Sequence, residues 1–248
     1  MFYMRKIFHM LKMAVPNICS MANLGCGFGA AIAVVNGRFD IAPWFIMIAM
    51  IFDAYDGKLA RYLNATSKLG CELDSFCDVT TFGIAPALLI GGIISKDHPI
   101  MGWVLGFTFV LAAVYRLARF NVMQADGDPH HEYTGLATTG AGGMIAALVI
   151  LNGYLTGSFN AGRVIDFMPV VTVVLSLLMV SRMRFPNTMD FADRQFRSPL
   201  YASILSGGVL LFAWVPQVVP SLIFTGYIAA GFLGIVKRRV HLRAAHKL

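Results

Sequence analysis

Four aspartates with helical spacing are the residues of this sequence best suited to chemistry. Asp53 and Asp56 lie three residues apart, Asp74 and Asp78 lie four apart, and eighteen positions separate the pairs. Because residues three or four apart share one face of a helix, each pair projects together. Apolar runs on both sides place the carboxylates slightly below a membrane surface, where charge is costly. Oxygen-bound divalent cations would neutralise them, and paired metals suit phosphoryl chemistry.

Small and basic residues within the same stretch predict a phosphate-bearing ligand. Gly57 and Ala60 leave the backbone open to close approach, and Arg61 can contact a phosphate through two hydrogen bonds. Gly70 is expected to let the chain re-enter the membrane tightly after a polar linker. A structural ion-pair cluster would account for the aspartates alone, and a cation transporter would need none of these four positions.

Composition predicts that helices embedded in a membrane position these residues. Of the 248 residues, 57% are hydrophobic and 13% are charged, and the mean hydropathy is +0.68. Soluble domains carry about 25% charged residues. Apolar runs extend from end to end, so we expect no separate soluble domain. The net charge of +7 is expected to mark cytoplasmic loops and acidic-lipid contacts, with no nucleic-acid partner.

We expect an all-α polytopic bundle of about eight spans, since about 20 apolar residues cross the hydrocarbon core. Residues 1–15 are predicted to form a basic interfacial helix, and residues 16–248 a single transmembrane catalytic domain. The spans are predicted at residues 16–36, 40–62, 73–95, 100–123, 136–157, 164–182, 199–215 and 218–237. With the N-terminus inside, seventeen of the 20 Lys and Arg residues lie on the inner side. This asymmetry predicts that both termini and the aspartates face the cytoplasm.

Two further sets of polar residues fall on predicted helix faces. Asn17, Ser20 and Asn23 recur every three residues in the first span, so they share a face. That face either forms hydrogen bonds between helices or borders a polar nucleotide cavity. Arg116 and Arg119, near the inner end of the fourth span, either bind a substrate carboxylate or are positive-inside residues that contact lipid phosphate.

The aspartate stretch resembles the signature of the CDP-alcohol phosphatidyltransferases. Every fixed position of D-x2-D-G-x2-A-R-x8-G-x3-D-x3-D is matched between residues 53 and 78. The resemblance implies a membrane enzyme, usually a homodimer, that uses two Mg2+ or Mn2+ ions while an alcohol displaces CMP from a CDP-linked lipid. It implies that three aspartates mainly hold metal, namely Asp53, Asp56 and Asp74. Asp78 would touch the second metal and act as general base. The residues implied to contact the CDP moiety are Gly57, Arg61 and Ser67.

Four other segments are similar to the phosphatidylserine synthase branch of this family, namely residues 82–86, 115–121, 135–143 and 179–186. The similarity covers about residues 14–190, so the last two predicted spans have weaker support. It implies transfer from CDP-diacylglycerol to L-serine at the cell's inner membrane, giving phosphatidylserine and CMP. Glycerol 3-phosphate or inositol phosphate is the alternative acceptor, although its phosphate would need a denser basic pocket than two arginines provide.

Overall fold

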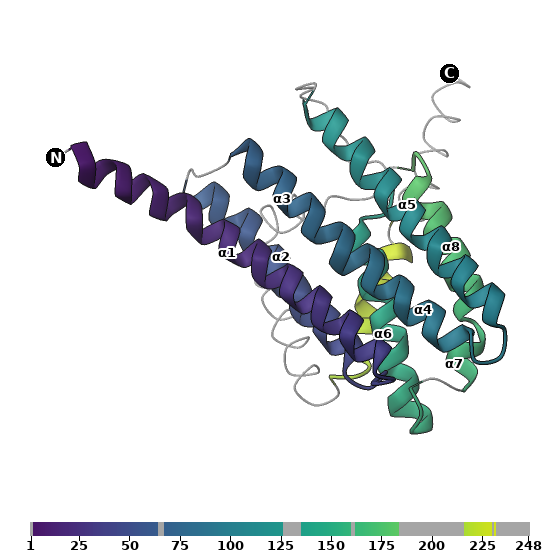
Figure 1. Cartoon of the computed structure of the whole chain (residues 1–248). Coiled ribbons are helices and arrows are strands. Elements are labelled where there is room, and N and C mark those ends of the chain that lie inside the picture. The colour runs from purple at the N-terminus through teal and green to yellow at the C-terminus, as the bar shows by residue number, and fades with distance from the viewer. Residues whose placement is uncertain are drawn as a thin grey trace, which may run out of the picture.

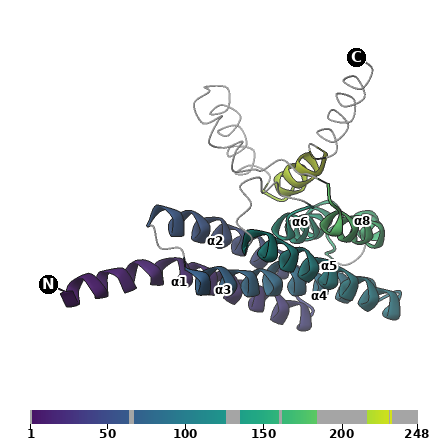
Figure 2. The ribbon, with the colours of Figure 1, turned by 90° about the horizontal axis from the view of Figure 1, so that it is seen from above.

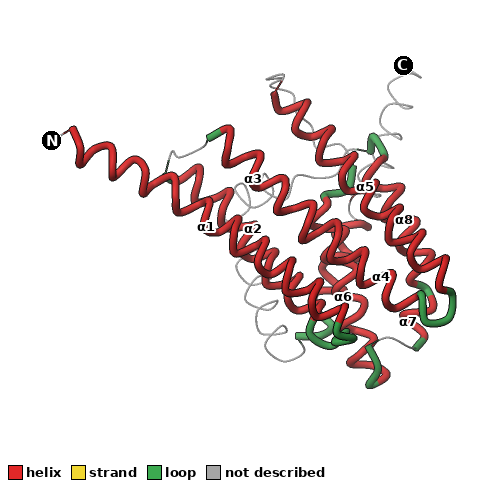
Figure 3. The backbone as a smooth tube through the Cα atoms, viewed as in Figure 1, coloured by secondary structure: helices red, strands yellow, loops and turns green. Residues whose placement is uncertain are grey.

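The computed structural model describes residues 2–63, 67–125, 135–159, 162–183, 216–229 and 231, and this part of the chain contains helices and loops without strands (Figure 3). The helices are α1 (Phe2–Val35), α2 (Ala42–Tyr62), α3 (Lys68–Asp78), the π-helix η1 (Val79–Ile84), α4 (Ala85–Ile94), α5 (Pro99–Ala125), α6 (Thr138–Thr156), α7 (Arg163–Asp166) and α8 (Met168–Val180). A further helix covers Val219–Ala229. The predicted all-α class is confirmed for these residues.

Within the described residues, four helical segments are long and apolar enough to cross a membrane: Val15–Val35, Leu69–Ile94, Pro99–Met123 and Thr138–Thr156. Each corresponds to a predicted span. The predicted span 40–62 forms α2, which is not among the four because Asp53, Asp56, Lys58 and Arg61 crowd its C-terminal half. The predicted span 164–182 is divided into α7 and the shorter apolar α8. The segment 199–215 lies outside the described residues.

The first helix is continuous with the first span. α1 runs without interruption from Phe2 to Val35 and includes Pro16, so the segment predicted as a basic interfacial helix and the first span form one helix. Its location at the membrane interface stays a prediction. A turn at Gly37, whose φ is +71°, then reverses the chain, and α2 packs back against α1 (Figure 1).

The signature is carried by α2 and α3, and α3 continues through η1 into α4 as one long rod. Ser67 begins α3, since its Oγ accepts a hydrogen bond from the Gly70 amide at 3.0 Å. This cap places Gly70 in the first helical turn of α3, and its role in a tight re-entry into the membrane stays a prediction. In η1 the Ala85 amide bonds the carbonyl of Thr80, and the following Pro86 has no amide hydrogen to continue an α-helical ladder. Such π turns are frequent at functional sites.

The helices form a layered bundle whose core is shared by α1, α2, the rod, α5, α6 and α8. Viewed from above (Figure 2), α1, α3 and α4 lie on one side, α2 and α5 come next, and α6, α8 and the Val219–Ala229 helix lie beyond. The largest fully buried side chains include Phe82, Phe109, Ile90 and Ile145. Gly142 brings α6 close to the rod, because a Cβ there would lie 2.9 Å from the Phe82 carbonyl oxygen. This packing holds the start of α6 beside the aspartates.

Candidate active site

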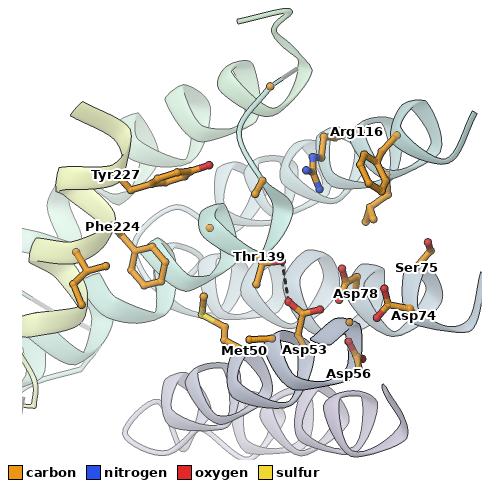
Figure 4. A pocket seen from close by; sticks show the side chains of 18 residues that line it. Met50, Asp53, Asp56, Asp74, Ser75, Asp78, Arg116, Thr139, Phe224 and Tyr227 are labelled. Carbon is orange, nitrogen blue, oxygen red and sulfur yellow. Dashed lines mark hydrogen bonds between the residues drawn. The ribbon is translucent and has the colours of Figure 1, made fainter. Parts of the chain in front are cut away.

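Three of the four signature aspartates converge between α2 and α3 (Figure 4). One carboxylate oxygen from each of Asp53, Asp56 and Asp74 lies within 4.8 Å of the others. Asp56 is 5% exposed, and the other two are half-buried. The geometry follows from the sequence, since the three-residue spacing projects Asp53 and Asp56 from one face of α2 toward the adjacent helix.

Asp78 lies at the C-terminal end of α3, immediately before η1, and faces the same pocket. Its side chain is 8% exposed, and its Oδ1 accepts a hydrogen bond from Nδ2 of Asn23 at 3.3 Å. It is not a member of the group of three carboxylates. Asp78 is therefore held by an amide while it lies beside the clustered aspartates (Figure 4).

The polar face of α1 contacts these aspartates from behind. The Ser20 hydroxyl donates to Oδ2 of Asp56 at 2.9 Å, one helical turn from the Asn23 contact with Asp78. Neither Ser20 nor Asn23 lines the pocket. Asn17 lies farther along, where its Oδ1 would be 3.3 Å from a Cβ on Gly70. For Ser20 and Asn23 the structure thus favours hydrogen bonding between helices over direct exposure to a ligand cavity.

The aspartates form one wall of a cavity of about 490 Å³. This volume lies in the range of small-molecule sites. Arg116 and Phe120 of α5 line it, with Thr139 of α6, and Phe224 and Tyr227 of the Val219–Ala229 helix complete it (Figure 4). The cavity therefore combines acidic, basic and aromatic walls drawn from five helices.

The start of α6 supplies two contacts that we did not predict from the sequence. The Thr139 hydroxyl donates to Oδ2 of Asp53 at 3.4 Å, and Nη1 of Arg116 donates to the hydroxyl of Thr138 at 3.2 Å. Both threonines lie in the segment 135–143, whose similarity to a known branch was the available signal. Two adjacent threonines thus contact the Asp53 carboxylate and the Arg116 guanidinium, which lie on different walls of the pocket.

The two arginines of α5 have different environments. Arg116 is 9% exposed and lines the pocket. Arg119 does not line it, and its guanidinium donates to the carbonyls of Met179, Val180 and Ser181 at 3.0 to 3.3 Å. Those carbonyls are at the C-terminal end of α8, so Arg119 caps that helix, and we no longer assign it to the acceptor.

Of the remaining residues predicted to contact the CDP-linked lipid, one lines the pocket among the described residues. Gly57 lines the pocket and is exposed, with no described atom within 4 Å of a Cβ built there. Ser67 and Gly70 form the N-terminal cap of α3 and do not line the pocket. The side chains of Ala60 and Arg61 lie outside the described residues.

The cluster of three aspartates fits a hard divalent cation. Its donors are carboxylate oxygens, which Mg2+ and Mn2+ prefer, and three such groups in close range repel one another without a counter-charge. Oδ1 of Asp74 is buried, and no hydrogen-bond donor among the described residues reaches it. Since buried acceptors are rarely left unpaired, this oxygen is available as a metal ligand.

Comparisons with known proteins identify relatives along most of the chain. The sequence matches the CDP-alcohol phosphatidyltransferase family over residues 13–178. It is 31% identical to a CDP-diacylglycerol–serine O-phosphatidyltransferase of Helicobacter pylori over 172 residues, covering 69% of this chain and 71% of that protein. It is 32% identical to the protein of the same name from Bacillus subtilis over 184 residues, covering 74% and 96%. An archaetidylserine synthase of Methanothermobacter thermautotrophicus is 31% identical over 176 residues, covering 70% of each chain.

Proposed function

Because the chain belongs to the CDP-alcohol phosphatidyltransferase family, we propose that it transfers the phosphatidyl group of CDP-diacylglycerol to the hydroxyl of L-serine. The products are phosphatidylserine and CMP. The observation that supports this most directly is the convergence of Asp53, Asp56 and Asp74 in one pocket, with Asp78 on the same wall. These are the acidic positions of the family signature.

Serine is the acceptor that the comparisons favour. The names of the three relatives share serine, although one of them makes an archaetidyl lipid. The pocket also contains a single described arginine, Arg116, which suits one carboxylate because a guanidinium can bind it through two hydrogen bonds. A phosphorylated acceptor carries more negative charge and would require additional basic residues.

Asp78 is proposed as the general base of the transfer. It accepts the proton of the serine hydroxyl while the serine oxygen forms a bond to the lipid-linked phosphorus. The bond between that phosphorus and the CMP oxygen breaks, and CMP leaves with the electron pair. Asn23 holds Oδ1 of Asp78, which leaves the second oxygen of this carboxylate to receive the proton.

Two divalent ions, Mg2+ or Mn2+, are the proposed cofactors, and Asp53, Asp56, Asp74 and Asp78 would hold them. When bound, such ions neutralise the pyrophosphate and stabilise negative charge on the leaving group. Ser20 and Thr139 orient Asp56 and Asp53 through their hydroxyl donors. For the CDP moiety we keep Gly57, Arg61 and Ser67 as proposed contacts.

The proposed setting is the cell's inner membrane, with the acyl chains in lipid and the active site facing the cytoplasm. The distribution of Lys and Arg supports this orientation. Cytoplasmic termini, eight spans and a homodimer remain part of the proposal.

An acceptor assay tests this function. Purified protein in vesicles receives CDP-diacylglycerol, Mn2+ or Mg2+, and labelled serine or labelled glycerol 3-phosphate in parallel. We expect labelled phosphatidylserine and stoichiometric CMP. Robust incorporation of glycerol 3-phosphate without serine would refute the proposed acceptor, and absence of CMP release with every alcohol would refute the proposed transfer.

A further inference from the structure

The Val219–Ala229 helix docks on α6 through matched glycine and aromatic residues. Gly140 and Gly143 lie three apart on α6, and a Cβ on Gly140 would contact the Tyr227 ring at 3.5 Å. A Cβ on Gly143 would overlap the ring of Phe224. Since Phe224 and Tyr227 are also three apart, two helix faces meet in register. The absence of side chains at Gly140 and Gly143 is what allows this approach.

This docking brings one polar group and one ring to the side of the pocket across from α3. Ile223, Phe224 and Tyr227 line the cavity, and among these only Tyr227 carries a polar group. Figure 4 shows its hydroxyl end directed into the pocket, toward the side where Arg116 lies, with Asp74 and Ser75 on the far side. A ligand between them would meet the aspartates at one end and the tyrosine and arginine at the other.

The helix lies outside the residues that the family model matches. The family match ends at residue 178, and the Bacillus subtilis relative is matched over 96% of its length by only 74% of this chain. The aspartates and Arg116 lie within the family match. The helix therefore adds to the pocket a wall that lies C-terminal to the residues matched by the family model.

We propose that the Val219–Ala229 helix completes the acceptor end of the pocket, with the Tyr227 hydroxyl donating to the serine carboxylate and Phe224 excluding water. This inference rests on the proposed function, because it assigns one end of that pocket to serine. A phenol donor and the Arg116 guanidinium suit a carboxylate together. Exclusion of water matters because water can replace serine: its oxygen bonds the phosphorus, CMP leaves, its proton passes to solvent, and phosphatidic acid forms.

Tyr227→Phe tests the hydroxyl, since it keeps the ring that packs on Gly140. Loss of a hydrogen bond to a charged group is expected to raise the KM for serine about tenfold or more. The KM for CDP-diacylglycerol and kcat should stay within twofold, a split that general structural damage would not produce. Tyr154→Phe is the matched control, because Tyr154 is an exposed residue of α6 that does not line the pocket.

Gly143→Leu tests the wall by displacing Phe224 together with Met50, since a Cβ there would overlap both. Gly226→Leu is its control, since a Cβ on Gly226 has no described atom within 4 Å. We expect phosphatidic acid to increase at least fivefold relative to phosphatidylserine in the first variant only. An unchanged serine KM in Tyr227→Phe overturns the inference, even where Gly143→Leu fails to fold. If wild-type protein converts serine in the same experiment, only the inference about Tyr227 fails and the proposed function holds. If wild-type protein is inactive with serine, the inference and the proposed function are both refuted.

Discussion

The hydrogen bond from Asn23 to Asp78 links the first helix to the proposed base and allows a quantitative prediction. Asn23 is fully buried, and its Nδ2 lies 3.3 Å from Oδ1 of Asp78. Hydrogen bonds to charged groups contribute about 1.5–3 kcal/mol, which corresponds to about 10- to 150-fold in a rate or equilibrium constant. Because 3.3 Å is slightly long for such a bond, we expect Asn23→Ala to lower kcat/KM by about 10- to 30-fold.

Steady-state transfer to labelled serine measures this effect, with thermal unfolding in detergent as the check on folding. Asn36→Ala is the matched control, since Asn36 is exposed and its Nδ2 bonds only the carbonyl of Ile32 among described contacts. It should remain within twofold of wild type. Asp78→Asn should lower kcat at least 100-fold, because it removes the proposed proton acceptor.

A double-mutant cycle then shows whether Asn23 acts through Asp78. Residues that work as one unit are strongly non-additive, so adding Asn23→Ala to Asp78→Asn should change kcat less than twofold. Two results would refute the reasoning. One is an Asn23→Ala variant with wild-type kcat/KM. The other is a double variant whose loss equals the product of the two single losses.

Three further predictions address metal binding, packing and the arginines. Asp74→Asn should weaken Mn2+ binding at least tenfold in electron paramagnetic resonance titrations without lipid. Glu72→Gln, which changes an exposed residue of the same helix, should leave Mn2+ affinity unchanged. Equal Mn2+ affinities of Asp74→Asn and wild type would exclude Asp74 as a ligand. Gly27→Leu should lower the free energy of unfolding by about 1–3 kcal/mol through overpacking, because a Cβ there would overlap Thr81. Gly25→Leu should not have this effect, because no described atom lies within 4 Å of a Cβ at Gly25. Arg116→Ala should raise the serine KM at least tenfold, while Arg119→Ala should lower thermal stability at an unchanged serine KM; the reverse pattern would restore Arg119 to the acceptor site.

Helical periodicity was sufficient to predict the acidic centre. The spacing of Asp53, Asp56 and Asp74 fixes which residues of each helix project together, and the short connection between α2 and α3 forces the two faces to meet. The same reasoning placed Ser20 and Asn23 on one face of α1. It left open what that face contacts, because a polar stripe in a membrane helix can serve either a neighbouring helix or a cavity.

The contacts that we did not predict are those between helices distant in the sequence. Thr139 reaches Asp53, and Tyr227 reaches the same pocket, only because glycines let α6 approach the rod and the Val219–Ala229 helix approach α6. Nothing in the local pattern of either residue specifies that neighbour. The π turn after Asp78 was also not predictable in full. Pro86 indicates a break in the helical hydrogen-bond pattern, but it does not indicate which side chains the break reorients.

Arg116 and Arg119 show why periodicity alone could not assign the acceptor. At about 100° per residue, positions three apart differ by about 60° around the axis, so the two side chains share a broad face. On α5 that face spans two neighbours: the start of α6, where Arg116 donates to Thr138, and the end of α8, where Arg119 caps three carbonyls. The unpaired carbonyls of a helix terminus compete for a guanidinium as effectively as a substrate carboxylate would. Which arginine remains for the pocket is therefore decided by where α8 ends, a property of the assembled bundle and not of α5.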